Sequence, residues 1–217
     1  MRKKSKTIKA SDKKLKYVIG VDEVGRGPLA GPVAVCAFAM PANYDKKCFL
    51  GVKDSKKLSE KARDKWAKTA KSLEKQGRCV FFVCYSSHKT IDNLGISKAV
   101  KTALDRAVLK VVRKLGCRPE ECNVLLDGSL KAPAKFRFQQ TIIRGDSKVQ
   151  IISIASVVAK VKRDKKMCRL AKKYPEYDFE IHKGYGTAKH YEKIRRYGLS
   201  PIHRKTFLKK LIPSSLS

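Results

Sequence analysis

The chain has 217 residues, and its 51 Lys and Arg against 19 Asp and Glu give a formal net charge of +32. A chain of this length can form one sizeable core, so we expect one main domain. The excess of positive charge predicts a polyanionic partner, with nucleic acid first, and no run of about 18 apolar residues is present to span a membrane.

The seven cysteines are an odd number in a chain too long to need disulfide staples, which favours a reducing cytoplasm. Cys79 and Cys84 lie an odd number of positions apart in an expected strand, so they should point to opposite faces. Cys117 and Cys122 share that spacing but lack a second pair or a nearby histidine, so a zinc site is not expected. We expect all seven to be small, buried or half-buried side chains.

The first half of the chain predicts a basic arm, three strands and one helix. Residues 1–16 carry eight Lys and Arg against one Asp, with little to bury, and predict a disordered arm rather than a signal peptide. Apolar runs predict the strands, the first two antiparallel, and Ser59 can cap the helix that Gly77 ends. The expected elements are strand 17–21, strand 32–40, helix 60–76 and strand 78–87.

The second half predicts longer helices and a basic end. Apolar residues recur at helical spacing from Ile96 until Gly116, and a later run is apolar nearly all round, as in a buried helix. After a polar connection over 88–94, the expected elements are helix 96–115, strand 123–126, strand 136–144, helix 149–164 and short basic helices within 182–198 and 203–212. Strands mixed with crossover helices predict an α/β domain with a mixed sheet over 17–180, and a basic C-terminal helical segment over 181–217.

Four acids stand out in this acid-poor chain, and three of the four positions follow or end an expected strand, so one face of the sheet could gather them: Asp22, Glu23, Asp127 and Asp146. A solvated acidic turn is the simpler interpretation of the first two. A compact acidic cluster in so basic a protein is, however, what two-metal phosphoryl chemistry requires, with the ions about 3.5–4 Å apart. The surrounding lysines would then hold the phosphate backbone.

Strand geometry restricts the first two acids, since adjacent residues of a strand point to opposite faces. Asp22 and Glu23 therefore cannot both enter one site from an ideal strand. We expect Asp22 to bridge the metals. Glu23 would reach the site because the pleat breaks at Gly25, or would contribute its carbonyl oxygen.

Seven short motifs, in order along the chain, carry a resemblance to a known family. They are DEVGRG at 22–27, DSKKLS at 54–59, LLDG at 125–128, RGDSK at 144–148, AKVKRD at 159–164, GYGT at 184–187 and HRKTF at 203–207. The series spans residues 17–207 and closely resembles that of ribonuclease HII, the bacterial type 2 ribonuclease H. The resemblance implies a ribonuclease H-like mixed sheet flanked by helices.

The resemblance also implies an activity, which is hydrolysis of the phosphodiester 5′ of a ribonucleotide embedded in duplex DNA. The products would carry 3′-hydroxyl and 5′-phosphate ends, and the RNA strand of RNA–DNA hybrids would be cleaved as well. Such an enzyme functions in the removal of ribonucleotides and RNA primers from DNA. It would use two divalent ions, Mn²⁺ or Mg²⁺.

Carried over by position, the family's metal-binding acids match the four acids named above. Gly25, Arg26 and Gly27 match the turn whose backbone reads the ribose 2′-hydroxyl, the group that distinguishes RNA from DNA. Tyr185 matches the tyrosine that stacks on the following deoxyribose, although a tyrosine between glycines is more commonly a half-packed turn residue. Lys56 and Lys57 lie in a loop expected to face phosphate, although paired lysines more commonly form a solvated face.

Other polar residues are left outside the predicted site. Asp164 follows Lys160 by four residues on a helix, so we expect it to pair with Lys160 or with Arg163. The four histidines are scattered without metal-ligand spacing; they are His88, His182, His190 and His203. For His182, which lies near Tyr185, we expect a structural polar role, with a substrate contact as the alternative.

Two alternatives remain open. Ribonuclease HIII shares the acids and the fold, but that family carries an additional N-terminal domain and lacks the GRG turn. A non-catalytic nucleic-acid-binding module would explain the charge without needing the carboxylates. We expect the protein to be a monomer. A contact with a replication clamp is unproven, because the segment IPSSLS shows no clear partner motif.

Overall fold

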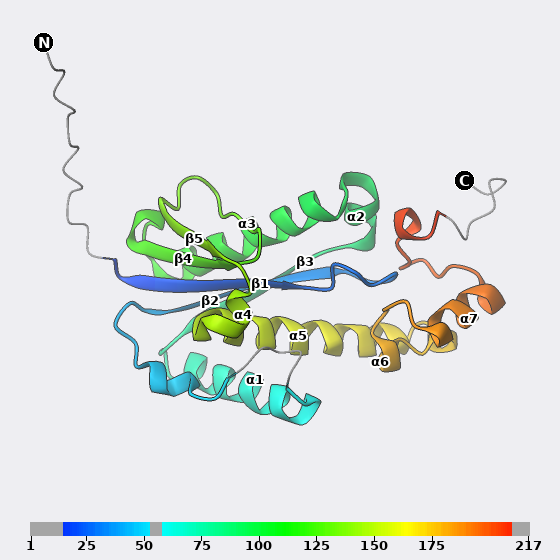
Figure 1. The fold of residues 1–217 in the computed structure, drawn as a ribbon, viewed down its shortest axis with the longest axis horizontal. Helices are drawn as coiled ribbons and strands as arrows, with labels where there is room; N and C mark the ends of the chain where they lie inside the picture. The colour runs from blue at the N-terminus through cyan, green and yellow to red at the C-terminus, as the bar shows by residue number, and fades with distance from the viewer. Residues whose placement is uncertain (1–14, 53–57, 210–217) are drawn as a thin grey trace, which may run out of the picture.

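The computed structural model describes residues 15–52 and 58–209, which form a five-stranded mixed sheet between layers of helices (Figure 1). The strands lie in the order β3-β2-β1-β4-β5, with β1–β2 and β2–β3 antiparallel and β1–β4 and β4–β5 parallel. They are β1 (Tyr17–Val24), β2 (Val33–Pro41), β3 (Val80–Ser86), β4 (Cys122–Asp127) and β5 (Phe138–Ile142). This confirms the predicted α/β fold with a mixed sheet.

Helices cover both faces of the sheet. The long helix α3 packs on one face, α5 packs on the other, and α1 packs on the outside of α5 (Figure 1). The helices are α1 (Glu60–Lys75), α2 (His88–Leu94), α3 (Ile96–Leu115), α4 (Gly145–Lys148), α5 (Gln150–Ala171), α6 (Phe179–His182) and α7 (Ala188–Tyr197). Short 3₁₀ turns are η1 (Lys46–Phe49), η2 (Pro119–Glu121), η3 (Pro175–Tyr177) and η4 (Lys205–Phe207).

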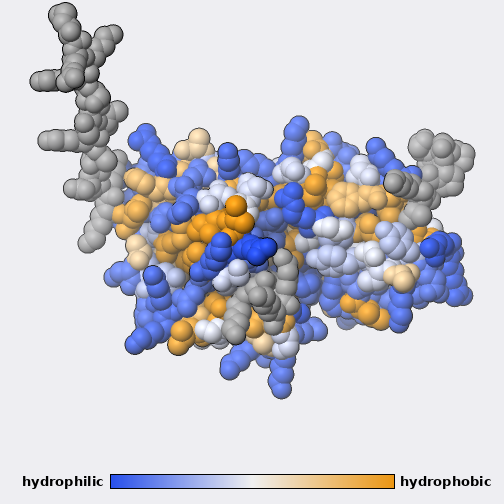
Figure 2. All heavy atoms as spheres, viewed as in Figure 1, coloured by the Kyte–Doolittle hydropathy of each residue, from blue (hydrophilic) through white to orange (hydrophobic). Residues whose placement is uncertain are grey.

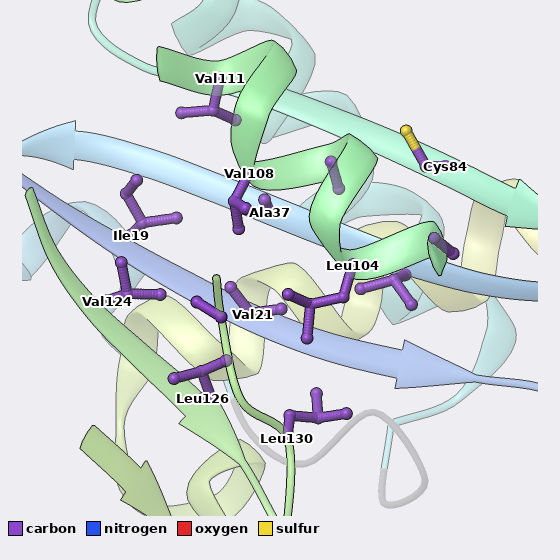
Figure 3. Close-up of a cluster of buried hydrophobic side chains, with 14 of the residues drawn as sticks. Ile19, Val21, Ala37, Cys84, Leu104, Val108, Val111, Val124, Leu126 and Leu130 are labelled. Atoms are coloured by element: carbon purple, nitrogen blue, oxygen red, sulfur yellow. The ribbon is translucent and has the colours of Figure 1, made fainter. Parts of the chain in front are cut away.

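The continuous apolar run of β2 is buried on both faces, which is why it lacks polar alternation. Val35 and Ala37 belong to the core under α3, whereas Cys36 and Phe38 belong to the core under α5. Figure 3 shows the first core, which gathers side chains of α3 with residues of β1, β2, β3 and β4. The labelled residues are Ile19, Val21, Ala37, Cys84, Leu104, Val108, Val111, Val124, Leu126 and Leu130.

The cysteines behave as predicted. All seven are free, and Cys79 and Cys84 lie in the cores on opposite faces of the sheet. The Sγ atoms of Cys117 and Cys122 lie 3.6 Å apart.

Helix α5 approaches β1 so closely that only glycine fits at position 20. A Cβ on Gly20 would lie 2.2 Å from the carbonyl oxygen of Ile151, which is a backbone atom of α5. The first half of α5, up to Ala159, has small or apolar residues on nearly every side, as expected from its sequence. The close approach also brings Ser156 and Lys160 of α5 beside the end of β1.

Two expectations about secondary structure were wrong. Residues 88–94 form helix α2 rather than a connection, because Ser87 caps it by accepting from the Thr90 N–H at 3.1 Å and Ile91 is buried. The second predicted basic helix is only the turn η4 within the part described up to residue 209. Arg204, just before η4, has an extended backbone and a fully buried side chain.

Some predicted features lie outside the described ranges, namely Lys56, Lys57, the segment IPSSLS and the first fourteen residues of the basic arm. Lys16, at the end of that arm, is described and pairs with Glu121 at 2.8 Å. No helix in the described ranges is long and apolar enough to cross a membrane. The face seen in Figure 2 is largely hydrophilic, as the composition predicts.

Candidate active site

A pocket of about 450 Å³ lies at the end of β1, where the strand gives way to the glycine-rich turn. It gathers all the predicted site residues except Lys56 and Lys57, which are outside the described ranges. The lining residues are Asp22, Glu23, Val24, Gly25, Arg26, Gly27, Asp127, Asp146, Ser156, Lys160 and Tyr185.

The parallel strands deliver the acids to one edge of the sheet. Asp22 lies in β1 and Asp127 is the last residue of the adjacent parallel strand β4. Asp146 lies in α4, four residues after the end of β5, and is 8% exposed. Because the carboxyl ends of parallel neighbours meet at one edge, three acids from distant parts of the sequence share the pocket.

Asp127 is oriented by the backbone of α4. Its Oδ1 accepts hydrogen bonds from the Gly145 N–H at 2.6 Å and from the Asp146 N–H at 3.4 Å. A Cβ on Gly145 would lie 2.7 Å from the Ile152 side chain and 3.3 Å from that same Oδ1. Glycine at this position therefore permits the close approach of Asp127 to α4.

Burial raises the pKa of the Asp22 carboxyl well above its ordinary value, since Asp22 is only 5% exposed. Repulsion from Glu23 and Asp127 acts in the same direction, while hydrogen bonds from Ser156 and from the Glu23 N–H oppose it. A cluster of carboxylates in such surroundings is stabilised by a nearby cation.

Glu23 lines the same pocket as Asp22 even though the two residues are adjacent in β1. The pleat ends two residues later at Gly25, whose φ is 90°. The Glu23 carboxylate lies 3.6 Å from Nη1 of Arg26 in the turn. That Glu23 serves as a metal ligand, through either its side chain or its carbonyl oxygen, stays a prediction.

The donor set suits a hard divalent cation, because it consists of carboxylate oxygens. No three Asp, Glu, His or Cys side chains within 15–52 and 58–209 already converge on one point as a preformed metal centre. By their chemistry, the carboxylates of the pocket fit a divalent cation.

Two buried arginines, which the motif pattern did not mark as site residues, support the turn at 25–27. A Cβ on Gly25 would lie 2.1 Å from Nε of Arg163, so Arg163 packs directly against this glycine. Arg204 donates to the carbonyls of Gly25 and Arg26, both at 2.7 Å. Both arginines lie inside motifs quoted above, but in a chain with 51 Lys and Arg nothing in the pattern marks them as buried.

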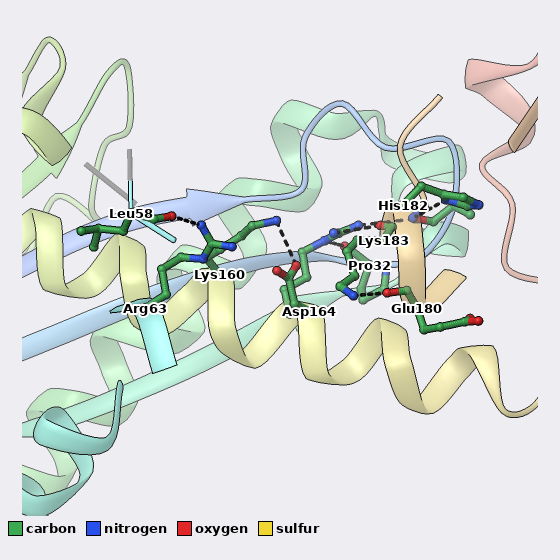
Figure 4. A network of polar contacts seen from close by, with 11 residues as sticks. Pro32, Leu58, Arg63, Lys160, Asp164, Glu180, His182 and Lys183 are labelled. Atoms are coloured by element: carbon green, nitrogen blue, oxygen red, sulfur yellow. Dashed lines mark hydrogen bonds and ion pairs between the residues drawn. The ribbon is translucent and has the colours of Figure 1, made fainter. Parts of the chain in front are cut away.

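Tyr185 lies at the pocket wall with 38% of its surface exposed. Its ring has Lys160 Nζ at 5.6 Å and the Arg163 guanidinium at 5.7 Å. Lys160 also pairs with Asp164 at 3.0 Å (Figure 4), as predicted for that acid. Lys160 and Ser156 are further pocket residues that the motif pattern did not place in the predicted site.

Three of the four histidines, which seemed scattered in the sequence, meet behind Tyr185. The rings of His182 and His190 stack at 4.2 Å, and the Nε2 atoms of His190 and His203 lie 3.0 Å apart. The folding of 183–203 into a compact unit brings them together, which spacing along the chain could not reveal. The structural polar role of His182 agrees with the prediction.

Comparisons with known proteins agree with the motif series. The family model of ribonuclease HII matches residues 19–210. The ribonuclease HII of Clostridium beijerinckii is 40% identical over 214 residues, covering 97% of this chain and 75% of the relative.

Solved structures show the same fold. Ribonuclease H2 from Pyrococcus horikoshii matches with a TM-score of 0.63 and 26% identity, covering 90% of this chain and 96% of that one. Bst-RNase HIII in complex with Mn²⁺ matches with a TM-score of 0.66 and 21% identity, covering 89% and 65%. With residues of five of the motifs lining one pocket and the family model matched over nearly its whole length, the chain belongs to the ribonuclease HII family of ribonuclease H-type endonucleases.

Proposed function

We propose that this protein incises duplex DNA on the 5′ side of a single embedded ribonucleotide and also hydrolyses the RNA strand of RNA–DNA hybrids. The observation that carries the proposal is the meeting of four carboxylates, the GRG turn and Tyr185 in one pocket. The carboxylates supply the chemistry, and the turn and the tyrosine supply the recognition of one ribose followed by a deoxyribose. The products carry 3′-hydroxyl and 5′-phosphate ends.

Four acids of the pocket would hold two divalent ions, Mg²⁺ or Mn²⁺. These acids are Asp22, Glu23, Asp127 and Asp146. Bound ions of this kind lower the pKa of a water molecule and stabilise the leaving oxygen. Ser156 and the Glu23 N–H orient Asp22, and the α4 backbone orients Asp127. Lys160 and Arg26 line the pocket as cations for the phosphates beside the scissile bond.

The substrate is selected by the two ends of the pocket. The backbone of residues 25–27 approaches the ribose because glycine lacks a side chain, and a Cβ on Gly27 would meet no atom within 4 Å. Tyr185 stacks its exposed ring on the next sugar, where a 2′-hydroxyl would clash.

We place this activity in the cytoplasm, in line with seven free cysteines, and we propose that the protein acts as a monomer.

The decisive experiment uses a DNA duplex that contains one ribonucleotide, with Mg²⁺ or Mn²⁺. The wild type should cleave on the 5′ side of the ribonucleotide, whereas Asp22→Asn should lose at least about 10³-fold in rate because it removes a carboxylate charge that would hold the metal. Asp105→Asn, on the exposed side of α3, is the matched control and should cleave normally. Cleavage that persists in Asp22→Asn would contradict the site, and an inactive wild type would favour the binding module.

A second arm of the assay tests Tyr185. Tyr185→Ala should lose incision at the single ribonucleotide far more than hydrolysis of a long hybrid, since the hybrid offers no junction with deoxyribose. Equal losses on the two substrates would contradict its role at the junction.

A further inference from the structure

Residues 200–204, which we call the strap, connect α7 to η4 and pair with the segment that follows the GRG turn. His203 forms a β-bridge with Ala30, and the Arg204 N–H donates to the Leu29 carbonyl at 2.8 Å. From the other side, the Gly31 N–H donates to the Ile202 carbonyl at 2.9 Å. Main-chain contacts therefore hold the strap against residues 29–31, the segment directly after the substrate-reading turn.

Arg204 fixes the turn itself through its guanidinium, which is fully buried. Nη2 and Nη1 donate to the carbonyls of Gly25 and Arg26, both at 2.7 Å, and Nε donates to Gly31 at 3.0 Å. No ion pair joins Arg204 to a carboxylate in the described part of the chain. A cation buried without a counter-charge is costly, and here the carbonyls of the turn offset that cost.

His203 links the strap to the loop that carries Tyr185. The Ser200 N–H donates to Nδ1 of His203 at 2.8 Å, so Nδ1 is unprotonated and the proton is on Nε2. That Nε2–H donates to Nε2 of His190 at 3.0 Å. His190 must then carry its proton on Nδ1, which donates to the Tyr185 carbonyl at 2.9 Å.

His182 contacts the loop that carries Tyr185 at Gly184, the residue before the tyrosine. The Gly184 N–H donates to Nδ1 of His182 at 3.1 Å, so its Nε2–H donates to the Tyr177 carbonyl at 2.7 Å. His190 and His203 are 0% and 2% exposed, and Phe179 packs against both rings. His203 and His190 are thus joined to the Tyr185 carbonyl by hydrogen bonds, and His182, with its own fixed tautomer, stacks on the His190 ring at 4.2 Å.

We propose that the strap sets the position of Tyr185 relative to the GRG turn and thereby determines selectivity for a single ribonucleotide. Arg204 holds the turn, and His203 holds Tyr185 through His190. These three residues are positioning residues, because they act through groups that contact the substrate. The inference rests on the proposed function of the turn and of Tyr185.

Two substitutions at one position test the link between His203 and His190. The amide nitrogen of Gln occupies the place of Nε2, so His203→Gln retains a donor to His190. Asn reaches only the place of Nδ1, so His203→Asn retains an acceptor for Ser200 but loses that donor. Both variants lose the imidazole ring, which makes each the control for the other.

The readout is the ratio of kcat/KM for the single-ribonucleotide duplex to kcat/KM for a long hybrid. His203→Asn should lower this ratio about tenfold or more, as expected for one buried hydrogen bond, while His203→Gln stays within about threefold of the wild type. An unchanged ratio in His203→Asn, or an equal fall in both variants, would overturn the proposal. A wild type that does not incise at a single ribonucleotide would overturn the proposed function, and the role of the strap with it.

The tautomers give a second test that needs no activity and no variant. Nitrogen-15 NMR of the wild-type protein at pH 7.5 should show His203 protonated on Nε2 and His190 on Nδ1. The opposite tautomer at either residue would overturn the link even if the protein incises as proposed. The result also decides the proposal if both variants at position 203 fail to fold.

Arg204→Lys tests the other end of the strap. Lysine keeps the charge but cannot donate in a fixed fork to two carbonyls. This variant should lower the preference for binding a hybrid over an all-DNA duplex by about tenfold, because the turn reads the ribose. An unchanged preference in a folded Arg204→Lys protein would remove Arg204 from the proposal.

Discussion

At the scale of single residues, the two glycines of the GRG turn have different reasons for being glycine. Gly25 has a φ of 90° and no room for a Cβ because Arg163 packs against it, whereas Gly27 has open space and no positive φ. Gly25→Ala should therefore lower both thermal stability and activity. Gly27→Ala should melt like the wild type and still lose cleavage about tenfold or more, since the added methyl group meets the ribose instead of the protein.

Thermal melting together with the cleavage assay checks this pair. A Gly27→Ala protein that folds and cleaves normally would exclude close contact between the turn and the sugar. An unaltered melting temperature in Gly25→Ala would contradict its contact with Arg163.

Residue pattern alone predicted the acids but not the arginines. Asp22 and Asp127 are recognisable because a carboxylate within three residues of a glycine at a strand end is unusual in an acid-poor chain. Arg163 and Arg204 are fully buried, yet arginine is ordinarily exposed and the chain is rich in it. Their role depends on carbonyl groups about 130 and 180 residues away, so it follows from the fold alone.

The buried histidines predict a dependence of stability on pH. Burial lowers the pKa of His190 and of His203 to about 4, from an ordinary 6.5. Between these values the unfolded chain binds protons that the folded chain does not, so the stabilisation is complete above pH 6.5 and is lost as pH falls toward 4. Each histidine should lower the free energy of unfolding by on the order of 2 kcal/mol between pH 7 and pH 5.

Urea unfolding at these two pH values measures the effect. The double variant with His190→Gln and His203→Gln should lose much of the pH dependence, while His88→Gln, which removes no hydrogen bond of His190 or His203, should keep most of it. Equal pH dependence in the wild type and the double variant would contradict the neutral state of the pair.

At the scale of elements, helix α2 anchors the C-terminal segment. The Asp92 carboxylate accepts from the N–H groups of Lys205 and Thr206, both at 3.0 Å, and from the Thr206 hydroxyl at 2.6 Å. Asp92→Ala should therefore destabilise the protein by about 1–2 kcal/mol, as the loss of a helix cap does. Chemical denaturation measures this change.

Asp105→Ala provides the comparison for Asp92. It removes an exposed pair with Lys101 on α3 and should cost less than about 0.5 kcal/mol. Similar losses in the two variants would mean that Asp92 is merely another surface carboxylate.

The same helix shows where prediction of elements failed. The segment HKTIDNL has one buried apolar residue, Ile91, which is too little for a periodic signal. Its helical state depends on the Ser87 cap and on contacts with residues distant in sequence. The long helices α3 and α5 were predictable because their apolar patterns extend over many turns.

At the scale of the whole molecule, the parallel arrangement of β1, β4 and β5 creates the site. The acids are separated by more than 100 residues in sequence between β1 and β4, and the sheet order alone makes them neighbours. The sequence predicted a mixed sheet and the gathering of the acids at one face. The order of the strands was not predictable from local pattern, because parallel pairing depends on long-range contacts.

The net charge of +32 makes a prediction for binding. If the surface neutralises about six phosphates of a duplex, the slope of log affinity against log salt is about −5, and affinity falls roughly 10³-fold between 50 and 200 mM salt. Fluorescence anisotropy with a labelled hybrid, in EDTA to prevent cleavage, measures this slope. Single-stranded DNA of equal length should give a shallower slope, since each contact then releases fewer counterions. A flat response with the duplex would mean that affinity comes from the pocket alone and that the surrounding lysines only solvate the surface.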